Sequence, residues 1–172
     1  MKKTILNFGL ISGAIGAVLM LASALYYKSN PDFKGGELYG YLGIFLSMIF
    51  VYLGVKSYRD KESGGAISFG KAFQIGIFIS IISCLIYVLT WMFVYATIMP
   101  DFMEKYITHT LEQLQASGAS AETIAAESQK MDEFKTMYQN PLVRFGLTFL
   151  EPFPVGFLVS LISAIVLRKN AA

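Results

Sequence analysis

The chain has 172 residues, of which 55% are hydrophobic and only 15% are charged, whereas soluble domains average about 25% charged residues. This composition excludes an ordinary soluble domain and favours lipid as the solvent, because the apolar residues occur in unbroken blocks. The net charge is +2, and the basic residues lie at the ends of apolar runs rather than on one face, so no binding of nucleic acid is expected. A single cysteine, Cys84, excludes an internal disulfide and a thiolate zinc site.

The first apolar run, residues 5–27, follows a basic start and is long enough to cross a bilayer as a helix. Gly9 and Gly13 are four residues apart, a spacing that allows a neighbouring helix to approach closely. An alternative is a cleaved signal peptide, because residues 22–24 form an A-x-A triplet. The tyrosine pair before Lys28 favours an uncleaved membrane anchor instead.

Two further apolar runs, residues 38–56 and 72–99, predict the second and third membrane spans. The third run is longer than a perpendicular span needs, so we expect it to tilt or to project beyond the bilayer. Gly76 and Ser80 give it a close-packing face, and Pro100 predicts its end.

Residues 101–141 form the only long polar stretch of the sequence. Within it Ile107, Leu111 and Leu114 follow the spacing of an amphipathic helix, and residues 117–120 are typical of a turn. We therefore expect a helical hairpin outside the bilayer, between the third and fourth spans.

The short flanks of the spans predict the orientation of the chain. Eight cations fall on one side of a four-span arrangement, against two in the only short loop on the other side. By the positive-inside rule, both termini are expected in the cytoplasm and the acidic hairpin outside it, in a cell inner membrane. The eight are Lys2, Lys3, Lys56, Arg59, Lys61, Lys71, Arg168 and Lys169.

The fourth apolar run, residues 142–167, contains a carboxylate and two prolines, Glu151, Pro152 and Pro154. A carboxylate in hydrocarbon is costly and marks a functional hypothesis by default. Each proline removes a backbone donor and disturbs the preceding turn, which predicts a helix interrupted near its outer third. Gly156 and Ser160 then provide a packing face for the inner half of the run.

Two interpretations of Glu151 remain open at this point. If the helix restarts at Pro152, Glu151 would cap its N-terminus, where the helix dipole favours a negative charge. Otherwise it would serve an ion, a proton or a ligand. Side chains at a similar depth that could reach it are Tyr87, Thr90, Trp91, Ser23, Tyr41 and, from two turns outward, Arg144.

Two short motifs stand out in the third and fourth spans: Phe69-Gly70-Lys71-Ala72-Phe73 at the entry of the third span and, in the last, Glu151, Pro154, Gly156, Ser160, Leu161 and Ile162 through Arg168 and Lys169. In these motifs the chain resembles a known bacterial membrane family, the domain of unknown function 4199. The resemblance implies an all-α, integral membrane four-helix bundle over nearly the whole chain. It brings no established activity, substrate or catalytic residue.

Two functions are weighed from these observations. The first is a non-enzymatic scaffold or interaction subunit, whose hairpin contacts another copy of the chain or an unidentified membrane partner. The alternative is a small transporter or proton-coupled subunit that uses Glu151 as its titrating group. The sequence offers no metal-ligand cluster, phosphate-binding glycine loop or activated nucleophile, so neither an enzyme nor a cofactor is expected.

Overall fold

A computed structural model describes residues 1–30 and 36–169 of the chain. In this part of the chain seven helices follow one another, and the longest are three uninterrupted helices of 27 to 29 residues. In chain order they are α1 (Lys2–Ser29), α2 (Gly36–Glu62), α3 (Phe69–Thr97), α4 (Phe102–Ala116), α5 (Ala121–Tyr138), α6 (Pro141–Leu150) and α7 (Phe153–Leu167).

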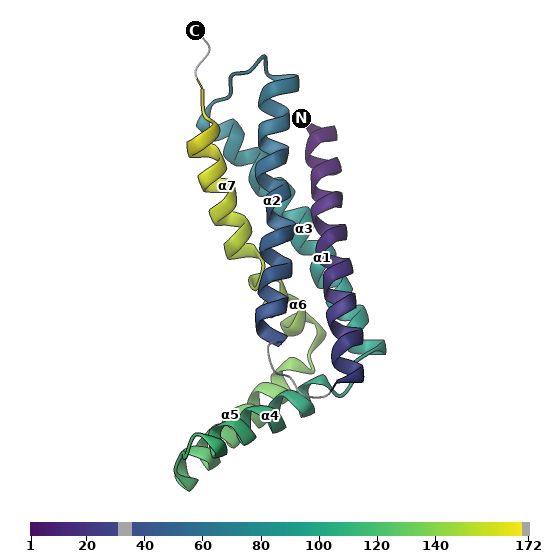
Figure 1. The fold of residues 1–172 in the computed structure, drawn as a ribbon, viewed down its shortest axis with the longest axis vertical. Helices are drawn as coiled ribbons and strands as arrows, with labels where there is room; N and C mark the ends of the chain where they lie inside the picture. Colours follow the sequence, from purple (N-terminus) through teal and green to yellow (C-terminus); the bar gives the residue numbers. More distant parts are fainter. Residues whose placement is uncertain (31–35, 170–172) are drawn as a thin grey trace.

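The helices α1, α2 and α3 form an elongated bundle whose fourth position is shared by α6 and α7 (Figure 1). Helix α3 is the central element, because it packs against α1, α2, α6 and α7. The hairpin of α4 and α5 projects from one end of the bundle, and the start of α1 and the end of α7 lie at the other end. The predicted all-α four-helix membrane bundle is therefore confirmed.

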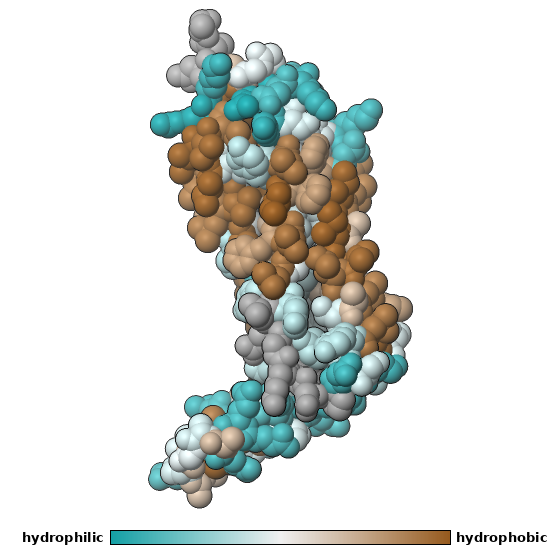
Figure 2. Space-filling model, in the orientation of Figure 1, coloured by the Kyte–Doolittle hydropathy of each residue, from teal (hydrophilic) through white to brown (hydrophobic). Residues whose placement is uncertain are grey.

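An apolar band covers the face of the bundle that Figure 2 shows, while hydrophilic residues gather on the hairpin and at the opposite end. Among the described residues, four segments are long and apolar enough to cross a membrane: residues 2–29, 39–62, 69–97 and 141–167. The last of these combines α6 and α7. The chain is thus a multi-pass membrane protein, with apolar side chains such as Leu89 and Val18 facing outward.

Helix α2 continues beyond the predicted membrane span, residues 38–56, and ends at Glu62. Of the six residues that follow Lys56 in the helix, three are good helix formers that can extend it into water: Arg59, Lys61 and Glu62. The helix ends where Gly64 and Gly65 adopt positive φ angles of 64° and 83°. The backbone N–H of Gly65 then donates to the Arg59 carbonyl at 2.9 Å, which closes the last turn.

Helices α3 and α7 cross through a reciprocal pair of small residues. A Cβ atom at Gly76 would lie 2.9 Å from the Cβ of Ser160 and 3.1 Å from its Cα. One turn away, a Cβ at Gly156 would lie 2.8 Å from the Cβ of Ser80. The Ser80 hydroxyl also donates to the Gly156 carbonyl at 3.1 Å, so backbone proximity and hydrogen bonding stabilise the same crossing.

Helix α1 packs on α3 through the two glycines singled out in the sequence. Gly9 lies against Ile82 and Gly13 against Ile86, each so close that a Cβ atom would be 2.8 Å from the isoleucine Cβ. These contacts give α1 a structural role in the bundle.

A buried serine network, which the sequence analysis did not identify, joins α1, α2 and α3. The Ser12 hydroxyl donates to the Ser47 carbonyl at 2.7 Å and lies 2.9 Å from the Ser83 hydroxyl. The Ser47 hydroxyl donates in turn to the Ile44 carbonyl at 2.7 Å. Each serine is a small residue that allows close helix approach and finds a partner for its hydroxyl group.

The turn of the hairpin lies where the sequence indicates it. Ser120 caps α5 by accepting a hydrogen bond from the Thr123 backbone N–H at 3.2 Å, and Gly118 turns the chain with a φ of 78°. Lys135 of α5 binds Glu104 of α4 at 3.0 Å, which links the two arms. The helical hairpin is therefore a paired unit next to the bundle.

Candidate functional site

The interruption expected in the fourth span is present between α6 and α7. Asn140 caps α6 by accepting from the Leu142 backbone N–H at 3.0 Å, and α6 ends at Leu150. Pro152 has no N–H to continue the helix, and the next regular bond runs from the Gly156 N–H to the Pro152 carbonyl at 3.0 Å. Pro152 is buried, whereas Pro154 is exposed.

Glu151 lies at this break, at the C-terminal end of α6. The N-cap position of α7 is Pro152, and no side chain caps that helix, so the capping interpretation of Glu151 is wrong. The reason is that Glu151 keeps helical backbone angles, φ −71° and ψ −57°, whereas an N-cap residue has non-helical angles. Its carboxylate instead interacts with the hydroxyl of Tyr87 on α3.

Arg144, two turns before Glu151, lies in an aromatic cage between the bundle and the hairpin. Its guanidinium carbon is 4.1 Å from the centre of the Tyr95 ring and 5.8 Å from that of Tyr138. The guanidinium also donates to the Tyr138 carbonyl at 3.5 Å and to the Met92 sulfur at 3.3 Å. Only 9% of Arg144 is exposed. Among the described residues no carboxylate forms an ion pair with it, so the rings supply its main electrostatic compensation.

Tyr138, the last residue of α5, connects these groups. Its hydroxyl accepts a hydrogen bond from the Trp91 indole N–H at 2.6 Å, and Thr148 of α6 is a second side-chain partner. Burial raises the pKa of Tyr138, while the hydrogen bonds from Trp91 and Thr148 and the charge of Arg144 oppose that rise. The ring is therefore held neutral at the junction of hairpin, α3 and α6.

The remaining side chains proposed as neighbours of Glu151 lie elsewhere. The Thr90 hydroxyl donates to the Ile86 carbonyl of its own helix at 2.8 Å. Tyr41 is exposed on α2. Ser23 is half-buried on α1, with no hydrogen bond to Glu151 within the described ranges. Of the set, the structure thus brings Tyr87 to Glu151, and Trp91 and Arg144 to Tyr138.

Sequence reasoning did not identify three members of this cluster, Tyr95, Tyr138 and Thr148. Tyr95 lies one turn after Trp91 on α3, and Tyr138 ends the hairpin just before the fourth span. Both are aromatic residues at predicted membrane boundaries, a signal that marks interfacial anchors. Their meeting around Arg144 depends on how α5 and α6 dock on α3, which no local pattern specifies.

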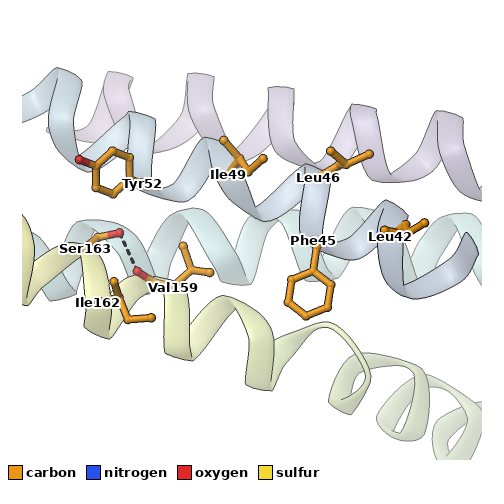
Figure 3. A pocket seen from close by; sticks show the side chains of 8 residues that line it. All are labelled: Leu42, Phe45, Leu46, Ile49, Tyr52, Val159, Ile162 and Ser163. Atoms are coloured by element: carbon orange, nitrogen blue, oxygen red, sulfur yellow. Dashed lines mark hydrogen bonds between the residues drawn. The ribbon is translucent and has the colours of Figure 1, made fainter. Parts of the chain in front are cut away.

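An apolar groove of about 510 Å³ runs between α2 and α7, within the apolar band. Figure 3 shows its wall, including Phe45 of α2 and Ile162 of α7. The only hydroxyl drawn at its α7 side, that of Ser163, donates to the Val159 carbonyl at 2.6 Å and is therefore satisfied. The lining residues are Leu42, Phe45, Leu46, Ile49, Tyr52, Val159, Ile162 and Ser163.

The chemistry available at the candidate site is that of a carboxylate, a guanidinium and phenols. Glu151 can accept a proton or a cation, and Arg144 with its rings can hold the hairpin to the bundle. Within residues 1–30 and 36–169, no group of three or more His, Cys, Asp or Glu side chains is arranged to hold a metal ion.

Comparison with protein families matches residues 7–169 to the model described as "Protein of unknown function (DUF4199)". No curated protein matches the chain significantly. No solved structure matches it significantly either.

Proposed function

We propose that the chain, which belongs to the DUF4199 family of proteins of unknown function, is a non-enzymatic interaction subunit of a membrane. Its bundle anchors the α4–α5 hairpin, and the hairpin contacts another copy of the chain or a different membrane protein. The membrane we propose is the bacterial inner membrane, with both termini in the cytoplasm, because the end of the bundle near the termini carries most of the cations.

The observation that carries this proposal is the projecting hairpin with its partly covered apolar stripe. Ile107, Leu111 and Leu114 on α4 are each only half-buried, although α5 packs beside them. A single neighbouring helix, α5, covers only part of the apolar stripe on α4. The uncovered part of this apolar surface is therefore available to a further chain. The hairpin lies outside the apolar band of the bundle (Figure 2), which supports the proposal that this surface lies beyond the hydrocarbon.

The attachment of the hairpin supports the same function. Met103 at the start of α4 is 3% exposed and Tyr138 at the end of α5 is 7% exposed, so both ends of the hairpin are embedded in the bundle. The Trp91 and Arg144 contacts fix the second end. A hairpin held at both ends presents its surface in a defined direction, which lowers the entropy cost of binding a partner.

Cysteine crosslinking in native membranes tests this proposal. We expect Leu111→Cys and Leu114→Cys, in a Cys84→Ala background, to give a crosslinked product with a short bifunctional maleimide. The matched controls are Gln113→Cys and Ala116→Cys, which are exposed and lie on the opposite side of the same helix from the stripe, so they should give none. A chain that stays monomeric at all four positions would contradict the proposal, and the size of any product distinguishes a second copy from another protein.

The rival function, a proton-coupled transporter, rests on Glu151. The carboxylate is exposed although it lies well inside the fourth apolar segment, and such carboxylates often mark proton or ion paths. Neither the α2–α7 groove nor the cavity at the start of α4 is lined by it. We therefore rank transport second.

Proton flux in proteoliposomes separates the two functions. On the interaction proposal we expect wild type and Glu151→Gln to show the same flux as empty liposomes under an imposed pH gradient and membrane potential. A flux above this background that Glu151→Gln abolishes, while Glu127→Gln on the hairpin retains it, would establish the transporter instead. The Gln substitution keeps the size of the side chain and removes only its charge and proton.

A further inference from the structure

A second cavity, of about 380 Å³, lies where α1 ends and α3 passes into α4. Its polar wall comes from separate elements, with Lys28 near the end of α1, Lys105 on α4 and Asp101 between α3 and α4. Its apolar wall includes Ile98 and Met99. The cavity thus joins two cations and one carboxylate to an apolar floor.

Among the described residues that line this cavity, the charges do not cancel. The Lys105 ammonium binds the Asp101 carboxylate at 2.8 Å. That hydrogen bond, with a smaller contribution from the charge of Lys28, holds the pKa of Asp101 below its usual range, so Asp101 is ionised at neutral pH. Two ammonium groups and one carboxylate leave one positive charge, which a singly charged anion would neutralise.

The depth of the cavity indicates which anion it meets. Helices α1 and α3 have 28 and 29 residues, so each is about 40 Å long. The hydrocarbon core is about 30 Å thick, and the headgroup layers extend the bilayer to about 40–45 Å. The ends of both helices, and with them Lys28 and Thr97, therefore reach the headgroup layer on the hairpin side. Phospholipid phosphodiesters, each with one negative charge, are concentrated there.

We propose that this cavity is a binding site for the phosphodiester headgroup of a membrane phospholipid. The Lys28 and Lys105 ammonium groups bind the phosphate oxygens, and Ile98 and Met99 contact the glycerol end of the acyl chains. Asp101 holds Lys105 in place. Its negative charge also lowers the affinity for the phosphodiester below the value that the two lysines alone would give. Basic pockets between membrane helices on the cytoplasmic side bind lipid headgroups, and the same pairing of ammonium groups with phosphate is proposed here for the hairpin side.

Native mass spectrometry of the full chain in detergent, titrated with phosphatidylglycerol, tests the site. We expect Lys28→Ala and Lys105→Ala each to lower the affinity about fivefold, because each removes one cation near the phosphate. Lys130→Ala removes an exposed lysine elsewhere on the hairpin and should leave the affinity unchanged. Asp101→Asn should raise the affinity about fivefold, a gain that misfolding would not produce.

Two further ligands identify the source of the phosphate. Diacylglycerol with the same acyl chains lacks the phosphodiester and should not compete, and inorganic phosphate in excess should displace little lipid because it lacks the apolar part. Equal binding of diacylglycerol, or unchanged binding in the double variant Lys28→Ala/Lys105→Ala, would overturn the proposal. Full displacement by inorganic phosphate would overturn the assignment to lipid.

Discussion

Gly76→Ala is expected to destabilise the membrane bundle by about 1–3 kcal/mol, the usual cost of inserting a methyl group into a packed interface. The added Cβ would lie 2.9 Å from the Ser160 Cβ and 3.1 Å from its Cα, so the α7 backbone itself would have to move. The higher helix propensity of alanine offsets up to about 1 kcal/mol of that cost. Unfolding in mixed micelles, followed by circular dichroism, measures the difference.

Gly70 provides the matched control on the same helix, because nothing lies within 4 Å of a Cβ at that position. Gly70→Ala should be neutral or stabilising by up to about 1 kcal/mol. The double variant Gly76→Ala/Ser160→Gly removes the opposing Cβ and should recover part of the lost stability. If Gly76→Ala and Gly70→Ala behaved alike, the close crossing of α3 and α7 would be refuted.

The crossing of α3 and α7 shows which features of helix packing local sequence patterns predict in this protein and which they do not. The spacing of Gly76, Ser80, Gly156 and Ser160 identified both packing faces, because a four-residue repeat of small side chains is a local property of a helix. It did not indicate that the two faces meet each other, with Gly76 on Ser160 and Gly156 on Ser80. That pairing depends on the relative height of two helices far apart in the sequence.

The break in the fourth span was predictable, whereas the surroundings of its charged residues were not. Proline lacks a backbone donor wherever it occurs, so Pro152 alone indicates an interruption. Glu151 has helical backbone angles and so continues α6 instead of capping α7, and its side-chain partner is Tyr87. Arg144 contacts the rings of Tyr95 and Tyr138 instead of a carboxylate, because the end of the hairpin docks beside it.

The end of α2 shows that an apolar run and the helix that contains it need not end together. The membrane span predicted from the apolar run stops at residue 56, and the helix continues to Glu62. Glu62 binds the N-terminal amine and the Thr4 hydroxyl, which ties the end of α2 to the start of α1. The glycines after Glu62, rather than the end of the apolar run, determine where the helix ends.

Arg144→Ala is expected to release the base of the hairpin from the bundle. The substitution removes the cation that lies 5.8 Å from the Tyr138 ring centre and the donor to the Tyr138 carbonyl, the two contacts of Arg144 with the hairpin. A cation–π contact contributes about 0.5–2 kcal/mol and a hydrogen bond about 1 kcal/mol, so the docked state should lose about 1–3 kcal/mol. Spin labels at Gln115 on the hairpin and at an exposed position of α2, such as Leu53, would show this as a broadened distance distribution.

Arg59→Ala is the matched control, because Arg59 pairs with Asp60 at the end of the bundle far from the hairpin. It should leave the distance distribution unchanged. Tyr138→Phe keeps the ring beside Arg144 but removes the acceptor of the Trp91 N–H, so it should broaden the distribution less than Arg144→Ala does. A narrow, unshifted distribution in Arg144→Ala would show that contacts such as the buried Met103 hold the hairpin without the aromatic cage.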